Sequence, residues 1–251
     1  MDHLTNQSSI DTDVTRDPQQ IEALERLVYV GQRGGLGALR GPKGSGKSKI
    51  LKSAAQELRG QGRRVLWIDS TGMTPREFLQ ALSDILGIGL GFVACETELR
   101  LRIRDHVTSC QEANGPLVFI VDHADQGSKK IVDDVRWLLG LLTGSSALLA
   151  SVGRNCSKPW RRFIADHSLL RIELGRLSEE AVHELIHQQI PDCELTRDAL
   201  AEIVASAQGR MHRLRQLLDL AMLAGSEDGE TLDSVSWKTL SQELSPSRKR
   251  A

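Results

Sequence analysis

The chain has 251 residues, of which 40% are hydrophobic and 26% are charged, and its formal net charge is -1. This length and apolar content allow a sizeable core, as in one large domain or one domain with a small satellite. The near-zero net charge excludes a global basic field that would draw the chain onto nucleic acid or an anionic membrane, so such binding would need a local patch.

Targeting and redox signals are absent from the sequence. No apolar run approaches the roughly 20 residues that span a bilayer, and the N-terminus lacks the basic start and apolar stretch of a signal peptide. We therefore expect a cytoplasmic protein that does not contact a membrane. The cysteines are scattered without a Cys-x-x-Cys pair, which argues against disulfides and a cysteine zinc site. They are Cys95, Cys110, Cys156 and Cys193.

The first elements lead into the most specific motif of the chain. Residues 1–20 are rich in Asp, Thr, Ser, Gln and Asn, which predicts a flexible leader. Pro18 is typical of a helix start and is expected to open a short helix through Leu24 and Val28. An apolar run over residues 36–39 then predicts the first strand.

This strand is followed by Gly-Pro-Lys-Gly-Ser-Gly-Lys-Ser, a complete G-x-x-x-x-G-K-S phosphate loop, and by a predicted helix over residues 50–58. The glycines let successive backbone N–H groups converge on phosphate oxygens, and the helix dipole points its positive end at the same anion. Lys47 is expected to reach the β- and γ-phosphates, and Ser48 to ligate Mg²⁺. The residues expected to bind nucleotide are Gly41, Pro42, Lys43, Gly44, Ser45, Gly46, Lys47, Ser48 and Lys49.

Strands and helices alternate after this loop. Arg64–Asp69 reads as a buried strand, and Thr74-Pro75 predicts the start of a helix that continues through Leu86. A further helix is expected over Leu99–Val107. Strands separated by helices of this length imply parallel pairing with right-handed crossovers, and therefore a doubly wound α/β core.

A second half of the nucleotide site follows from the strand Leu117–Val121, which ends in Asp122. A carboxylate in this position holds the hydration shell of Mg²⁺, so we assign Asp122 as the Walker B aspartate. His123 stands where many ATPases have a glutamate that activates water. Histidine could act as a weaker base, or the site could be a switch that hydrolyses slowly. Asp125 is a third candidate, which would reach back to the metal or water if the chain turns into a helix. A purely structural role for His123 also stays open.

The rest of the chain divides into core, lid and tail. A helix over residues 131–142 and strands over 147–152 and 169–174 complete the core. From residue 178 three helical segments without a strand predict a separate subdomain; they are 178–190, 196–207 and 211–223. The predicted parts are a leader over 1–20, a P-loop α/β core over 21–177, a helical lid over 178–224 and a partly disordered tail over 225–251.

With a phosphate loop, an aspartate-terminated strand, a polar residue after the next strand and a trailing helical segment, residues 25–224 resemble the AAA+ ATPases. The layout is most similar to the compact bacterial group of general-secretion-pathway A type and transposition helper ATPases, through Val65–Ile68, Asp122–Leu139 and Val152-Gly153-Arg154. The resemblance implies a P-loop parallel sheet with flanking helices and an all-helical lid, ATP and Mg²⁺ as cofactors, and a homo-oligomer in the ATP state.

The resemblance also implies residues that sense or complete the site. Ser151–Asn155 correspond to the sensor 1 region, with Arg154 or Asn155 facing the γ-phosphate, and a polar turn is the alternative. Arg161 and Arg162 lie where the superfamily often carries an arginine finger supplied by a neighbouring subunit. Such a guanidinium stabilises charge on the transferring phosphoryl group, and a solvated basic pair is the alternative.

The segment Gly209–Arg215 resembles the Gly-x-Pro-Arg sensor 2 motif at the start of the last helix. It departs from that motif because Met211 stands where proline is usual and His212 stands where arginine is usual. Arg213 is the first candidate for the sensor 2 role, and Arg210 is the second.

Two functions stay open. One is a Mg²⁺-dependent ATPase that drives assembly or remodelling of a partner protein or protein–DNA complex. The other is a nucleotide-gated binding module with little hydrolysis of its own. ATP is the expected nucleotide through the resemblance, and no guanine-specific Asn-Lys-x-Asp motif occurs. A DNA role would need a basic groove, for which Arg59, Arg63, Arg64, Lys129, Lys130, Arg161 and Arg162 are available.

Overall fold

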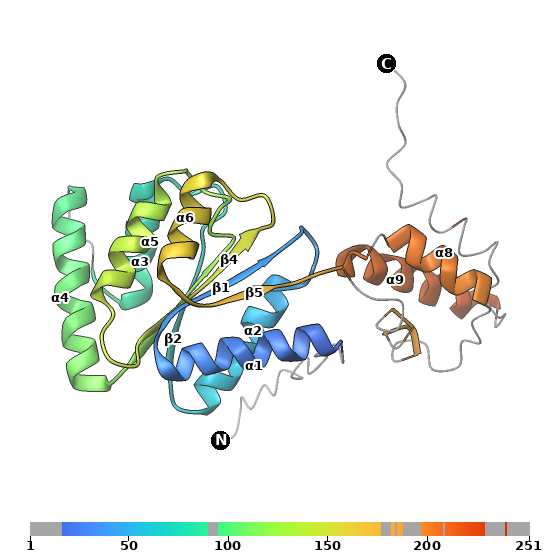
Figure 1. Ribbon diagram of the computed structural model, residues 1–251, viewed down its shortest axis with the longest axis horizontal. Helices are drawn as coiled ribbons and strands as arrows, with labels where there is room; N and C mark the ends of the chain where they lie inside the picture. Colours follow the sequence, from blue (N-terminus) through green and yellow to red (C-terminus); the bar gives the residue numbers. More distant parts are fainter. Residues whose placement is uncertain are drawn as a thin grey trace, which may run out of the picture.

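The computed structural model describes residues 17–89, 95–176, 182–183, 185–187, 197–207, 209–228 and 239. Within them, five parallel strands form one sheet in the order β2-β3-β4-β1-β5, with helices on both faces (Figure 1). The predicted parallel α/β core is confirmed. The strands are β1 (Gly35–Gly41), β2 (Arg64–Asp69), β3 (Leu117–Asp122), β4 (Ala147–Gly153) and β5 (Ser168–Glu173).

The helices form one layer on each side of the sheet and a separate pair beyond it (Figure 1). One face is covered by α1 (Pro18–Arg33) and α2 (Lys47–Gly60). The other is covered by α3 (Pro75–Leu86), α4 (Glu96–Asn114), α5 (Ile131–Leu141) and α6 (Lys158–His167). The separate pair is α8 (Arg197–Ala207) and α9 (Met211–Asp228).

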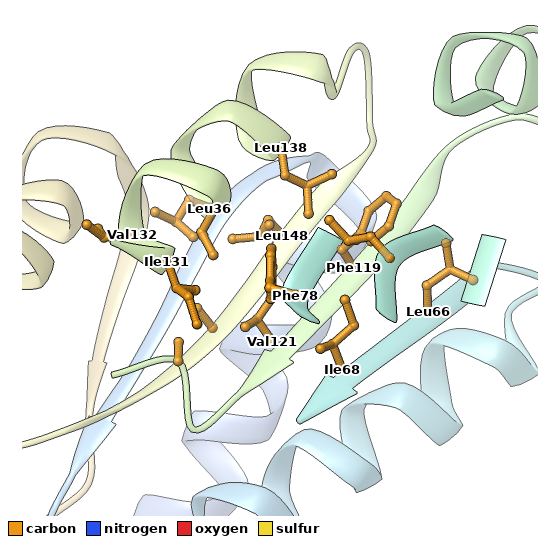
Figure 2. Close-up of a cluster of buried hydrophobic side chains, with 14 of the residues drawn as sticks. Leu36, Leu66, Ile68, Phe78, Phe119, Val121, Ile131, Val132, Leu138 and Leu148 are labelled. Atoms are coloured by element: carbon orange, nitrogen blue, oxygen red, sulfur yellow. The ribbon is translucent and has the colours of Figure 1, made fainter. Parts of the chain in front are cut away.

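Alternating strand side chains build the two cores. Phe119 and Val121 of β3 point into the core beneath α3 and α5, which Figure 2 shows, and Val118 and Ile120 point into the core beneath α1 and α2. This alternation is the two-residue period of a strand, and all four side chains are fully buried. The central strand β3 therefore reads as a continuous apolar run because both of its faces are covered.

The predicted proline starts are confirmed by capping interactions. Asp17 caps α1, since its Oδ1 accepts a hydrogen bond of 3.0 Å from the Gln19 N–H, and Pro18 is the first helical residue. Thr74 caps α3 through a reciprocal capping box with Glu77.

Two predictions differ from the structure or fall outside it. The helix predicted over Leu99–Val107 runs from Glu96 to Asn114, because its two ends carry polar, mostly exposed residues that give no apolar period. The predicted lid helices over 196–207 and 211–223 correspond to α8 and α9. Only 182–183 and 185–187 of the first lid helix are described, and they are helical. The leader before residue 17 and nearly all of the predicted tail lie outside the described residues.

An ion pair joins α4 to α5 at the buried carboxylate of Asp134. The Arg100 guanidinium donates a hydrogen bond to Asp134 Oδ1 and lies 5.2 Å from the centre of the Trp137 ring. Burial raises the pKa of Asp134, and the charge of Arg100 opposes this rise. Arg100 therefore offsets part of the cost of keeping a carboxylate in the core.

Arg100→Met is expected to lower the free energy of unfolding by about 1 to 3 kcal/mol at pH 7, because a buried charged group loses its partner. Since the folded-state pKa of Asp134 lies above its unfolded value, the penalty grows as the pH rises through and above about 4 and shrinks below it. Urea denaturation at pH 4 and pH 7 measures both effects. Arg104→Met, an exposed arginine on the same helix, is the control; equal stability of the two variants at pH 7 would refute the prediction.

Candidate functional site

The phosphate loop joins β1 to α2 at the carboxyl edge of the sheet, as predicted. Gly44 and Gly46 have φ angles of 82° and 88°, in the left-handed region that favours glycine. Lys47 Nζ donates hydrogen bonds to the carbonyl oxygens of Gly41 (3.0 Å) and Pro42 (2.8 Å), so its ammonium lies against the loop. The loop therefore combines backbone N–H donors with the Lys47 ammonium, an arrangement that suits the binding of a phosphate group.

Lys47 is buried, and two carboxylates lie within its electrostatic reach. Burial lowers the pKa of Lys47, whereas the negative charges of Asp125 and Asp122 act to raise it. Asp122 ends β3 and is itself 2% exposed. The sequence-predicted Walker A lysine and Walker B aspartate are thus brought to one place in the fold.

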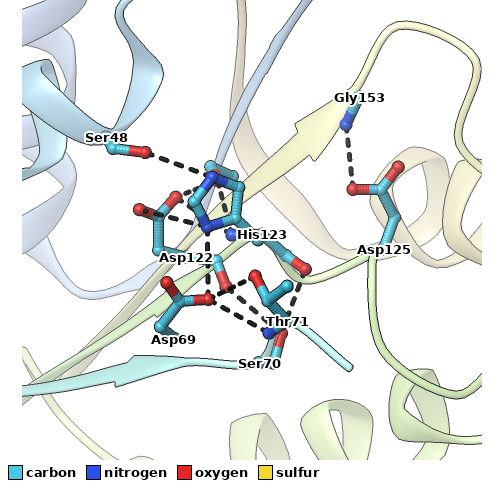
Figure 3. Close-up of polar contacts among 9 residues, drawn as sticks. Ser48, Asp69, Ser70, Thr71, Asp122, His123, Asp125 and Gly153 are labelled. Carbon is cyan, nitrogen blue, oxygen red and sulfur yellow. Dashed lines mark hydrogen bonds and ion pairs between the residues drawn. The ribbon is translucent and has the colours of Figure 1, made fainter. Parts of the chain in front are cut away.

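Asp122 is fixed by its neighbours at the ends of the adjacent strands. Its Oδ1 accepts hydrogen bonds from the Ser151 hydroxyl of β4 and from the His123 N–H at 2.9 Å. Asp69, the last residue of β2, lies level with Asp122 in the strand register (Figure 3). Parallel strands bring their carboxyl ends to one edge, and here that edge carries a cluster of acidic and hydroxyl side chains.

His123 turns back toward the phosphate loop. Its Nε2 lies 3.4 Å from Ser48 Oγ, and its Nδ1 lies 3.2 Å from Asp69 Oδ1 (Figure 3). Partial burial acts to raise the pKa of Asp69, but hydrogen bonds from Thr71 and then from His123 lower it below the usual value. The lowered pKa favours the ionised form of Asp69, whose Oδ1 accepts hydrogen bonds from Thr71 and lies beside the His123 ring.

Asp125 contacts β4. Its Oδ1 accepts a hydrogen bond of 3.0 Å from the Gly153 N–H (Figure 3), and the chain after β3 forms turns up to the start of α5 at Ile131. For Asp125 to reach back to the metal, the chain would have to turn into a helix directly after the strand, and it does not. A Cβ at position 153 would lie 2.9 Å from Asp125 Oδ2, so the Asp125 side chain would have to shift to admit a larger residue there.

Arg154 and Asn155 form an exposed turn after β4. The Arg154 N–H donates to the Gly41 carbonyl oxygen at 3.1 Å, and the Arg154 carbonyl accepts a hydrogen bond from Arg40 at 2.5 Å. The backbone of the predicted sensor 1 turn is thereby tied to the start of the phosphate loop. Arg40 also pairs with Glu173 at the end of β5.

Arg161 and Arg162 lie on α6, before the fifth strand, and both are exposed. They line different hollows. Arg161 lines one with Arg40 and Glu173, near the ends of β1 and β5, whereas Arg162 lines one with Arg136 and Lys158. Arg162 is 81% exposed and lies 3.5 Å from Asp166, which leaves its guanidinium largely in solvent.

The sensor 2 candidates lie at the start of α9. Gly209 has a φ of 66° and, with Arg210, precedes the helix, whose first residue Met211 is buried. Arg213 is half-buried one turn into the helix. Gly209 also lines a small hollow that includes Ser45 of the phosphate loop and Gln20 of α1.

The basic residues considered for DNA do not form one groove. Arg59 and Arg63 lie at the end of α2 and before β2, and they donate hydrogen bonds to the carbonyl oxygens of Val65 and Gln32. Lys129 and Lys130 precede α5 at the opposite edge of the sheet. Among the described residues, no helix is both long and apolar enough to cross a bilayer. Of the cysteines, Cys110 and Cys156 are buried and Cys95 is exposed; Cys193 lies outside the described residues.

The sequence analysis did not identify Asp69 or Ser151 as individual site residues, although both contact the Asp122 and His123 pair. Asp69 was read as the end of a strand, and Ser151 as the first residue of a loosely matched sensor region. The signal that could have identified Asp69 is its position, because it ends the strand next to β3 just as Asp122 ends β3. Ser151 becomes informative only once β4 is known to lie beside β3.

Comparison with known proteins gives one family match: residues 30–154 match the family described as "AAA domain". No curated protein matches the chain. Among solved structures, the chain is similar to Cdc6p from Pyrobaculum aerophilum, with a TM-score of 0.67 and 16% identity over 90% of this chain and 66% of that one.

Two further structures have the same architecture. The ORC1 protein of Aeropyrum pernix, solved in complex with DNA, has a TM-score of 0.67 and 16% identity over 93% of this chain and 68% of that one. A RuvB mutant of Thermotoga maritima has a TM-score of 0.58 and 14% identity over 90% and 67%. The chain spans about two thirds of the length of these proteins. The likeness establishes its fold, the AAA+ P-loop fold with a five-stranded parallel sheet.

Proposed function

We propose that this chain, which has a P-loop AAA+ fold and whose residues 30–154 match the AAA domain family, is a Mg²⁺-dependent ATPase. ATP binding and hydrolysis would be coupled to assembly or remodelling of a partner protein or protein–DNA complex. The observation that carries the proposal is that Asp122, at the carboxyl end of β3, lies within electrostatic reach of Lys47 in the phosphate loop. The proposal includes membership in the compact bacterial group of general-secretion-pathway A type and transposition helper ATPases. It also includes a division of the chain into an α/β ATPase core over residues 21–177 and a helical lid over residues 178–224.

The donors at the site fit a nucleotide with a divalent cation. The backbone N–H groups of Gly41–Lys49 and the Lys47 ammonium suit the phosphates, and the Ser48 hydroxyl and Asp122 carboxylate are oxygen ligands of the kind that Mg²⁺ takes. When bound, Mg²⁺ neutralises charge on the phosphate oxygens. Ser151 would hold the Asp122 carboxylate in one orientation, and the Arg154 turn would hold the first residue of the loop.

The alternative is a nucleotide-gated switch with little hydrolysis. It is favoured by the hydrogen bonds of His123, whose two ring nitrogens face Ser48 and Asp69. Steady-state ATP turnover by wild type and by His123→Glu separates the two functions. Turnover by wild type supports the ATPase, whereas tight ATP binding without turnover, restored in His123→Glu, supports the switch.

Arg161 and Arg162 are proposed to act on a nucleotide held by a neighbouring subunit. We expect alanine at one of them to lower turnover at least about tenfold without weakening ATP binding, because a trans guanidinium stabilises charge in the transition state only. Mixing that variant with Lys47→Ala should restore turnover, since the mixed interface pairs an intact loop with an intact arginine. Arg104→Ala is the control; wild-type turnover by both α6 variants would contradict a finger in this position.

The proposal also includes a contact between the lid and the nucleotide, and a response of the ATPase to DNA. Arg213, or Arg210 in its place, would contact the γ-phosphate from the start of α9. The Aeropyrum pernix ORC1 protein was solved with DNA. Because the basic residues of this chain are divided between two edges of the sheet, we expect any stimulation by duplex DNA to require an assembled oligomer.

A further inference from the structure

His123 lies between the two residues expected to hold the cation. Its Nε2 is 3.4 Å from Ser48 Oγ, and its Nδ1 is 3.7 Å from Asp122 Oδ2. Figure 3 shows the imidazole directed from the end of β3 toward the first turn of α2. An imidazole nitrogen is a metal ligand in its own right, so its presence beside a hydroxyl and a carboxylate changes the donor set of the site.

The backbone of His123 is held in a strained conformation that directs the ring there. Its φ is 51°, and among the described residues it is the one non-glycine with a positive φ. The His123 N–H donates to Asp122 Oδ1 and to Ser151 Oγ, each at 2.9 Å. A strained backbone conformation persists when surrounding contacts fix it. Here these contacts come from Asp122 and Ser151, at the carboxyl ends of β3 and β4.

Asp69 determines which ring nitrogen is available. A carboxylate only accepts hydrogen bonds, so the Nδ1 that lies 3.2 Å from Asp69 Oδ1 carries the proton of the neutral ring. Nε2 then presents its lone pair toward Ser48. A carboxylate that accepts from one nitrogen while the other faces a metal is the usual arrangement around histidine ligands.

The spacing of the two donors suits a shared cation. Cis ligands of an octahedral cation at about 2.1 Å lie roughly 3.0 Å apart. The Ser48 Oγ to His123 Nε2 distance of 3.4 Å is slightly longer than this separation, so a small shift of either side chain brings both donors within reach of one cation. Within the described part of the chain, no three His, Cys, Asp or Glu side chains form a metal site by themselves, so phosphate oxygens of the nucleotide would complete the coordination.

We propose that His123 Nε2 is a direct ligand of the divalent cation that accompanies the nucleotide, which makes this site prefer Mn²⁺ to Mg²⁺. The inference rests on the proposed nucleotide site. Mg²⁺ is a hard ion that favours oxygen and dehydrates reluctantly, whereas Mn²⁺ accepts both oxygen and imidazole ligands. This role also removes His123 from the candidates for the general base.

Pulsed electron paramagnetic resonance on Mn²⁺ tests the ligand directly. The sample contains the full chain, Mn²⁺ and an ATP analogue that cannot be hydrolysed, and a directly bound imidazole gives a ¹⁴N coupling to the metal. Affinities for the Mn²⁺ and Mg²⁺ complexes of the same analogue are measured in parallel. We expect the ¹⁴N coupling in wild type and at least about tenfold tighter binding of the Mn²⁺ complex.

His123→Asn is the matched variant, because asparagine tolerates the positive φ and replaces the imidazole by an amide oxygen. We expect it to lose the ¹⁴N coupling and the preference for Mn²⁺. Asp69→Asn should keep the coupling but bind the Mn²⁺ complex about tenfold more weakly, since it loosens the ring orientation. His183→Asn is the control and should behave as wild type, because His183 is an exposed histidine next to Val182, which belongs to a separate hydrophobic cluster.

The outcomes separate this inference from the proposed function. Binding of the analogue without a ¹⁴N coupling, or an unchanged metal preference in His123→Asn, would overturn the inference and leave the nucleotide site intact. Failure of wild type to bind the analogue with either cation would overturn the nucleotide site itself, and the inference with it.

Discussion

Lys47→Ala is expected to lower ATP turnover by about 10³-fold, the largest effect of any single substitution on the proposed activity. The Lys47 ammonium donates hydrogen bonds to the carbonyl oxygens of Gly41 and Pro42, which holds it next to the place of the phosphates. Each charge-assisted hydrogen bond contributes about 1.5 to 3 kcal/mol, so ATP affinity should fall by about tenfold or more. Calorimetric titration with ATP and a turnover assay measure the two effects.

Lys52→Ala is the control for this variant, because Lys52 is an exposed lysine on the same helix and has no role in the site. It should retain wild-type affinity and turnover. The fold of Lys47→Ala should survive, since Gly41 O still accepts the hydrogen bond from the Arg154 N–H. ATP binding by Lys47→Ala equal to that of wild type would contradict the assignment of the loop.

Asp122→Asn is expected to lower turnover by about 10²-fold while leaving metal-free ATP binding nearly unchanged. The substitution keeps the size of the side chain but removes the negative charge that would hold the hydrated cation. Removing this charge also removes one of the two influences that raise the pKa of Lys47. ATP affinity measured with Mg²⁺ and with a chelator separates the metal effect from a general loss of binding.

Asp84→Asn, an exposed carboxylate on α3, is the matched control and should show wild-type behaviour in both conditions. A stability measurement should accompany the assay, because Asp122 accepts hydrogen bonds from Ser151 and His123 inside the sheet edge. Equal dependence of ATP binding on Mg²⁺ in wild type and Asp122→Asn would show that Asp122 does not hold the cation.

Local patterns were sufficient to predict the core of the fold. The strand Arg64–Asp69 was predicted with its observed bounds, because its apolar run is bounded by charged residues. The phosphate loop was predicted from spacing alone, because glycine, lysine and serine are each required at fixed positions by the chemistry of phosphate binding. Helix lengths were less certain, since the exposed ends of α4 carry no apolar period.

The site beyond the two Walker motifs depended on sheet order, which the local sequence does not contain. The pairing of Asp69 with Asp122 requires β2 to lie beside β3, and the bond from Ser151 requires β4 on the other side of β3. The contact of Asp125 with Gly153 likewise joins residues 28 positions apart. The backbone strain of His123 is a product of these contacts, so only the structure could reveal where its ring points.

The most direct test is steady-state ATP hydrolysis by the purified chain across a protein concentration series, with and without duplex DNA. We predict turnover whose specific rate rises with protein concentration, as expected when one subunit completes the site of the next, and which Lys47→Ala abolishes. Turnover that persists in Lys47→Ala, or absence of both ATP binding and hydrolysis in wild type at every concentration, would contradict the account.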